Sequence, residues 1–148
     1  AWHVRRGAMT GAAYVELRIQ ELAIHDWDIR SATETIPSLY PDSVPILLDM
    51  TPRWLGMCFR SSAKLPKPVV YGFNVDSQNY RLTVTGDGFD MISGEATETD
   101  FSLSATGEQF LLFTYGRLTA ADGIHLGRLS INGDVAHLDQ FEVWFKGL

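Results

Sequence analysis

The spacing of apolar residues changes near residue 68, and this change constrains the fold more than any other feature of the chain. Before it, apolar side chains recur every three or four residues, the period of an α-helix. After it, the stretches PVVYGFNV, QNYRLTVTG and DFSLSAT are rich in the residues that favour β-strands and alternate in the way strands do. Turns are predicted at residues 76–77 and 86–88. The segregated patterns predict an α+β fold.

The rest of the second half returns twice to helical spacing. A short strand is predicted around residues 89–94, followed by a helix over 107–118. A last strand at 127–133 and a helix over 134–146 complete the order. The predicted order is helix, sheet, helix, strand, helix, and this segregated order is typical of α+β domains.

The strongest helix prediction is residues 10–34, which contain no proline and offer Thr10 as an N-cap. Its apolar residues fall on two sides. One side is a seam made of Val15, Ile19, Leu22 and Ile29, and Leu17 and Ile24 lie roughly opposite. A helix that is apolar on two sides is predicted to pack between neighbours.

Three prolines within ETIPSLYPDSVP, residues 34–45, predict a connector that cannot continue this helix. The connector is the best domain boundary in the chain. Helical spacing resumes over residues 43–60, where Pro52 predicts a break or kink and Thr51 a fresh N-cap.

Composition excludes several classes of protein. With 45% hydrophobic and 20% charged residues, the 148-residue chain is predicted to form a folded core. A net charge of −6 argues against binding to nucleic acid, which needs a basic face. Cys58 is the single cysteine, which fits a reducing compartment, and no apolar run reaches the roughly 20 residues of a membrane span. We therefore expect a cytoplasmic protein without a membrane span.

A polar line crosses the first helix within ELAIHDWDIRSA. Glu21, His25 and Asp28 follow one another at helical spacing, so their side chains share a sector. A carboxylate and an imidazole at this spacing are a chemically sound pair of zinc ligands, but a simple Glu–His hydrogen bond explains them as well. Asp28 could support the imidazole or form a salt bridge with Arg18 or Arg30, and both interpretations stay open.

Other candidate groups have ordinary explanations. Cys58 lies on an apolar stripe with Leu55 and Phe59, so it is predicted to be a core residue. His125 and His137 have no paired ligands at useful spacing and are predicted to be surface or capping residues. His3, near the start of the chain, could in principle supply a metal ligand.

Residues 68–146 resemble the sterol-carrier-protein-2-like fold, and specifically the C-terminal domain of the mycothiol-dependent maleylpyruvate isomerase family. The resemblance rests on the order of YRLTVTGDG, DFSLSA, FLLFTYGRL and GRLSINGD and covers roughly residues 43–148. It implies an antiparallel or mixed sheet with helices on one face. It assigns residues 36–148 to the sterol-carrier-like domain.

ELAIHDWDIRSA resembles the last helix of that family's N-terminal domain, a metal-binding four-helix bundle of the DinB type. In the family this helix carries an E-x-x-x-H pair, and Glu21 and His25 match it. Residues 1–35 would thus be a remnant of the bundle, and the chain would be truncated at its N-terminus. The resemblance implies zinc or another divalent metal, and mycothiol or a related thiol, but only in a complete bundle.

Further implications concern ligands. In the isomerase branch an arginine binds the carboxylate of a small-molecule substrate, and Arg117 or Arg128 could match it, with Arg117 preferred. Either arginine could equally cap a helix C-terminus. Sterol-carrier-like domains also enclose an apolar tunnel, for which we select Leu47, Leu55, Phe59, Phe110, Phe113 and Phe141 as lining candidates. The simpler explanation is that these side chains only fill the core.

The sequence thus leaves two functions. One is a fragment of a metal-dependent, thiol-cofactor isomerase or S-transferase, inactive alone. The alternative is a non-catalytic sterol-carrier-like module that binds an apolar small molecule or mediates self-association. In a fragment without the rest of the bundle, a homodimer through the seam of the first helix is the simplest way to cover that apolar seam.

Overall fold

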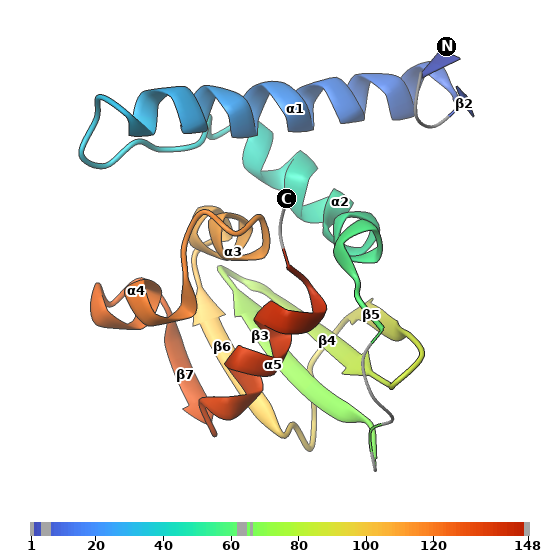
Figure 1. Ribbon diagram of the computed structural model, residues 1–148, viewed down its shortest axis with the longest axis vertical. Helices are drawn as coiled ribbons and strands as arrows, with labels where there is room; N and C mark the ends of the chain where they lie inside the picture. The colour runs from blue at the N-terminus through green and yellow to red at the C-terminus, as the bar shows by residue number, and fades with distance from the viewer. Residues whose placement is uncertain (1, 4–6, 62–64, 66, 147–148) are drawn as a thin grey trace. The chain divides into compact units, whose positions relative to one another are not determined.

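The computed structural model describes residues 2–3, 7–61, 65 and 67–146. Its chain forms two compact units, residues 1–49 and 50–148, which are described separately below. Figure 1 shows the elements. The helices are α1 (Gly11–Ser31), α2 (Ser43–Cys58), α3 (Gly107–Thr114), α4 (Ala120–His125) and α5 (Ala136–Trp144). The strands are β1 (Trp2–His3), β2 (Gly7–Ala8), β3 (Val69–Val75), β4 (Gln78–Val84), β5 (Phe89–Ser93), β6 (Phe101–Ala105) and β7 (Ser130–Gly133).

The first unit is dominated by α1. The Thr10 side chain accepts a hydrogen bond from the Ala13 N–H at 3.1 Å, which confirms the predicted N-cap. Leu17 and Ile24 are buried, whereas Leu22 is 62% exposed. The prediction that the helix is covered on both apolar sides is therefore wrong within one chain, because only the side of Leu17 and Ile24 is covered.

The connector after α1 is held to that helix by polar contacts. The Trp27 indole N–H donates to the Pro37 carbonyl oxygen at 2.9 Å. Arg30 bonds to Asp26 at 2.8 Å and also donates to the carbonyl oxygen of Ser38. These bonds bring the proline-containing segment back along the end of α1.

Helix α2 contains residues of both units, because the boundary between residues 49 and 50 lies within it. Pro52 lies inside α2 and does not divide it into two helices, so the predicted fresh N-cap at Thr51 is not formed. No described helix is long and apolar enough to cross a membrane.

The second unit contains a five-stranded sheet in the order β5-β4-β3-β6-β7. Strands β3, β4 and β5 form an antiparallel meander, and β7 is antiparallel to β6. Strand β6 instead pairs with β3 in parallel, with Tyr71 opposite Phe101 and Val75 opposite Ala105. The connection from β5 to β6 must therefore cross β4 and β3. The sheet is mixed, and this confirms the predicted α+β class.

Helices α3 and α5 cover one face of this sheet, which is called the inner face (Figure 1). Burial alternates along the strands as period-two patterning requires: Tyr71, Phe73 and Val75 are buried, and Asn74 between them is exposed. The core therefore lies between the inner face and the two helices.

Two predictions in this unit were wrong in detail. The predicted helix over 107–118 stops at Thr114, because Gly116 has φ 73° and the N–H of Arg117 bonds back to the Leu112 carbonyl at 2.8 Å, the geometry of a Schellman motif. Helix α4 was not predicted at all. Its N-cap Thr119 accepts a bond from the Asp122 N–H at 3.1 Å.

Candidate functional site

Aromatic side chains form a continuous cluster on the inner face of the sheet. On β3, the Phe73 ring lies 5.1 Å from Phe110 of α3 and 5.9 Å from Phe141 of α5. Phe113 of α3 stacks on Phe141 at 5.0 Å, which joins the two helices. Phe141 in turn lies 4.8 Å from Phe145. We call these five rings, together with Phe59 and Phe89, the inner aromatic cluster.

The cluster reaches the surface at one end. Phe59, which follows α2, lies 5.5 Å from Phe145 and 5.4 Å from Phe89 at the start of β5. Phe59 and Phe89 are half-buried, whereas the inner members are nearly inaccessible. Phe59 forms an isolated β-bridge with Phe145, supported by the bond from the Arg60 N–H to the Trp144 carbonyl at 2.7 Å. The interior therefore ends at two short, weakly paired backbone segments, residues 59–60 and 144–145.

Four of the six predicted lining residues, Phe59, Phe110, Phe113 and Phe141, belong to this cluster. Phe59 lies at its half-buried end, and the other three are buried. Leu55 and Leu47 are buried as well, and Leu47 belongs to the first unit. The rings fill the interior at contact distances, so a ligand could enter only by displacing side chains.

The polar groups around the cluster have structural partners. The Tyr71 hydroxyl donates to the His137 carbonyl oxygen at 2.8 Å, and burial raises the pKa of Tyr71. Burial also raises the pKa of the Cys58 thiol to about 11, so this cysteine is not a nucleophile near neutral pH. None of the buried described residues is an Asp, Glu, Lys or Arg. The environment suits an apolar ligand and offers no acid–base pair.

The two predicted metal ligands face different partners. Glu21 forms an ion pair with Arg18, and the Nδ1 atom of His25 lies 3.2 Å from an Asp28 carboxylate oxygen. The His25 side chain is 69% exposed. Among the described residues, no group of three or more His, Cys, Asp or Glu could hold a metal ion. Metal binding by Glu21 and His25 stays a prediction, and this part of the chain lacks the further ligands it needs.

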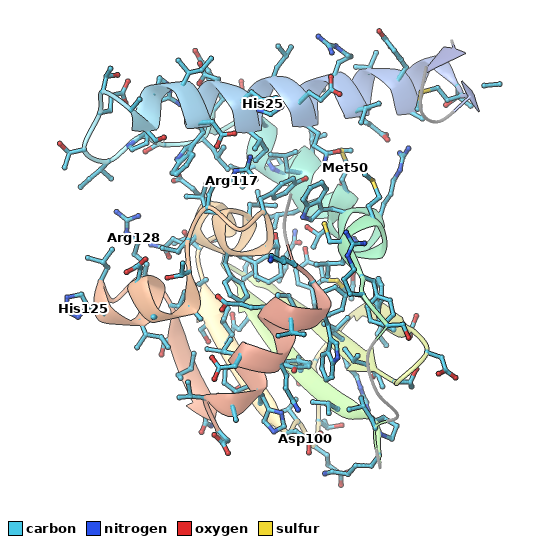
Figure 2. The ribbon with its side chains drawn as sticks, in the orientation of Figure 1. His25, Met50, Asp100, Arg117, His125 and Arg128 are labelled. Atoms are coloured by element: carbon cyan, nitrogen blue, oxygen red, sulfur yellow. The ribbon has the colours of Figure 1, made fainter. Side chains whose placement is uncertain are left out.

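The two candidate arginines lie in neighbouring loops, after α3 and α4 (Figure 2). A terminal nitrogen of Arg117 donates to the Tyr115 carbonyl oxygen at 2.7 Å, which is a helix-end role. Arg128 is half-buried, and its backbone N–H bonds to the Gly123 carbonyl at 2.7 Å. A substrate-binding role for Arg117 stays a prediction. The side chain of His3 lies outside the described residues.

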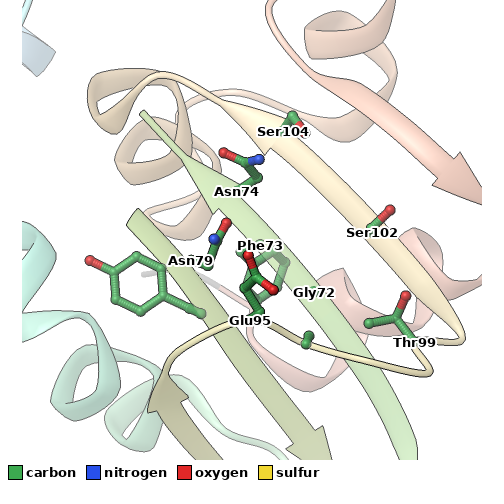
Figure 3. A pocket seen from close by; sticks show the side chains of 10 residues that line it. Gly72, Phe73, Asn74, Asn79, Glu95, Thr99, Ser102 and Ser104 are labelled. Carbon is green, nitrogen blue, oxygen red and sulfur yellow. The ribbon is translucent and has the colours of Figure 1, made fainter. Parts of the chain in front are cut away.

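The sequence analysis missed a second feature, a hollow of about 340 Å³ on the opposite, outer face of the sheet. It is lined mostly by polar residues (Figure 3). Alternation predicts that Asn74, Asn79 and Ser104 lie on the outer face, but only the strand register places them beside one another. A glycine between two aromatic residues, Gly72, was the remaining signal in the sequence.

Comparison with known proteins relates the second unit to one family. Residues 67–146, more than half of the chain, match the model of the SCP-2 sterol transfer family. Among curated proteins, none has a significantly similar sequence.

Solved structures share the fold at low sequence identity. Sterol Carrier Protein-2 like-3 from Aedes aegypti is 18% identical with a TM-score of 0.50, and the match covers 71% of this chain and 95% of that one. The stereoselective inverting sec-alkylsulfatase Pisa1 from Pseudomonas sp. is 16% identical with a TM-score of 0.57. That match covers 72% of this chain, which spans only 16% of the length of the sulfatase. At these identities the likeness concerns the fold alone.

Proposed function

The chain belongs to the SCP-2 sterol transfer family, and on this basis we propose that its second unit is a non-catalytic module that binds an apolar small molecule. The observation that carries the proposal is the inner aromatic cluster, which runs from the core to a half-buried end at Phe59 and Phe89. A sterol or a fatty acyl chain is the matching class of ligand, since it needs aromatic surface and few polar contacts.

Binding would start at the exposed end of the cluster. Among the described residues, one isolated bridge, the bond from Arg60 to Trp144 and the ring contact of Phe59 with Phe145 join Phe59 and Arg60 to the end of α5. Separating these two backbone segments would uncover Phe145 and then Phe141 without breaking the pairing of the sheet. The ligand would replace ring contacts with its own apolar surface, each square ångström removed from water contributing roughly 25 cal/mol.

A fluorescent sterol and a fluorescent fatty acid, each titrated into the purified chain, test this proposal. Saturable binding is expected, and Phe59→Ser should weaken it about tenfold, equivalent to about 1.4 kcal/mol. Val143→Ser is the matched control, because Val143 lies on α5 but is 63% exposed. If neither probe binds saturably, or if both variants behave alike, the proposal fails.

The isomerase interpretation is the narrower alternative, and it concerns a longer protein. It would require Glu21, His25 and further ligands around a metal, together with a thiol cofactor such as mycothiol. The described residues contain no such ligand set. A native mass spectrum with a stoichiometric zinc adduct that is lost in His25→Ala would revive it. A cytoplasmic location likewise remains a prediction from the single cysteine.

We also propose self-association through α1. Val15, Leu22 and Ile29 are 55%, 62% and 73% exposed and recur every seven residues along one helix. A seven-residue repeat matches another helix with the same repeat, and a second copy of this chain supplies one. In an antiparallel pair centred on Leu22, Val15 would lie opposite Ile29 of the second copy.

A further inference from the structure

The outer face of the sheet carries a row of polar side chains across three strands. Asn74 of β3 lies directly opposite Asn79 of β4 and opposite Ser104 of β6. Residues directly opposite on neighbouring strands have their Cβ atoms about 5 Å apart and share a face. The three side chains can therefore contact one small molecule together.

The connection from β5 to β6 forms a wall beside this row. It passes across β3 at Gly72, where an added Cβ atom would lie 3.0 Å from the Thr99 methyl carbon and 3.2 Å from the Ala96 Cβ. Glycine thus permits the close approach of the loop to the strand. Glu95 and Thr99 of this loop line the hollow together with the polar row, as Figure 3 shows.

Four polar side chains that line the hollow have no polar partner among the described residues. The side chains of Asn74, Asn79, Glu95 and Ser104 make no hydrogen bond or ion pair with another described residue. Two amides, a hydroxyl and a carboxylate are therefore left to water or to a ligand. Amides and hydroxyls both donate and accept, so they match a ligand that does the same.

Charge narrows the class of ligand further. Glu95 is the one charged residue among those that line the hollow, and Glu98 lies in the same connection, whereas Asp100 of that connection is paired with Lys67. Arg81 occupies the neighbouring row opposite Gly72 but is not among the lining residues. The negative surroundings disfavour anions. A volume of about 340 Å³ is at the lower end of the range for ligand sites and is large enough for a small molecule.

We propose that the hollow between Asn74, Asn79, Ser104 and Glu95 binds a small polyhydroxylated molecule without negative charge, such as a monosaccharide or an amino sugar. The site lies on the other face of the sheet from the inner aromatic cluster, and the two share Phe73 of β3. Vicinal hydroxyl groups would bond to the two amides and to Ser104. An ammonium group, where the ligand has one, would pair with Glu95.

A two-dimensional NMR titration of the full chain with glucose, glucosamine and gluconate tests this proposal. Glucose and glucosamine should shift the side-chain amide signals of Asn74 and Asn79 and the backbone signals of residues 95–99, with saturation at millimolar concentration. Gluconate should bind at least about tenfold more weakly than glucosamine. Glu95→Gln should remove the preference for glucosamine over glucose.

Asn79→Leu should weaken binding of glucose about tenfold or more, whereas Asn132→Leu, an exposed asparagine outside the lining, should leave it unchanged. Unchanged signals elsewhere in the spectra of both variants show that they are folded. Absent or non-saturating shifts, or equal binding by the two asparagine variants, would overturn the site. Gluconate binding as tight as that of glucosamine would overturn the proposed ligand class.

Discussion

The indole N–H of Trp54 donates a hydrogen bond to the carbonyl oxygen of Thr114 at 2.9 Å, and the Trp54 ring stacks on Tyr115 with 4.2 Å between centroids. Thr114 is the last residue of α3, whose final carbonyl groups lack partners within the helix. One side chain near the end of α2 thus satisfies and covers the end of α3.

Replacing Trp54 with phenylalanine keeps an aromatic ring but removes the donor. Because the Thr114 carbonyl would lose this partner in a buried place, Trp54→Phe should lower the free energy of unfolding by about 1–3 kcal/mol. Urea denaturation followed by circular dichroism measures the difference. Val143→Ala, at a site that is 63% exposed, should change it by less than about 0.5 kcal/mol. Equal effects would contradict the assigned role of the indole.

Gly72→Ala should destabilise the second unit by about 1–3 kcal/mol, because the new methyl group presses on Thr99 and Ala96. Thr99→Ser removes the nearest carbon, so the double variant should recover part of the loss, as a double-mutant cycle would measure. At Gly88 an added Cβ meets nothing within 4 Å, and Gly88→Ala serves as the control. Additive effects of Gly72→Ala and Thr99→Ser would show that the loop does not press on the strand.

Asp100 links stability to pH. The Lys67 ammonium group, 2.8 Å away, and the Val70 N–H hold the pKa of Asp100 below its usual value, and His137 acts in the same direction. A lowered folded-state pKa gives stability that is complete above the unfolded pKa, about 4, and is lost as pH falls through the folded value. Asp100→Asn should therefore be less stable than the original chain at pH 7, with the gap closing in acid. A gap that is unchanged between neutral and acidic urea titrations would contradict this.

Cys58 should react with a thiol reagent only when the protein unfolds. Its thiol is fully buried and its pKa is about 11, so little thiolate exists and little reagent can reach it at pH 8. Absorbance during reaction with an aromatic disulfide reagent, with and without denaturing urea, measures the two rates. Fast reaction of the native chain would show that the interior opens readily at the end of α2.

Dimer formation depends on the exposed seam of α1. Leu22→Lys places a charge at the centre of the proposed antiparallel pair and should convert a dimer into a monomer in sedimentation. Val143→Lys adds the same charge at an equally exposed site on α5 and should not change the mass. A monomeric original chain would exclude this interface.

Local patterns predicted the elements better than their limits. Period-two alternation predicted β3, β4 and β6, because one face of each strand is buried. The apolar repeat predicted α1, although Val15, Leu22 and Ile29 of that repeat are exposed. The helix predicted over 107–118 extends past Gly116, whose positive φ ends α3. Helix α4 has few apolar residues and depends on the Thr119 cap, so periodicity did not reveal it.

The sites were less predictable than the fold. The aromatic residues of the inner cluster could be selected, but their close packing depends on how α3 and α5 meet over the sheet. The outer hollow requires Asn74, Asn79 and Ser104 in one row. Local spacing in the sequence does not determine the register between strands that are distant along the chain. The parallel pairing of β3 with β6 could not be foreseen from the order of the strands.

That parallel pairing also matters for a growing chain. Until β6 has been synthesised, the meander of β3, β4 and β5 presents β3, the central strand of the finished sheet, as a bare edge. An unpaired strand edge that carries Tyr71 and Phe73 on one side can pair with a strand of another chain. The chain from the end of β5 at Ser93 to the end of β6 at Ala105 must still be synthesised before the partner strand is complete. During synthesis the incomplete chain is therefore prone to aggregate through this unpaired edge, and we expect a chaperone to cover it.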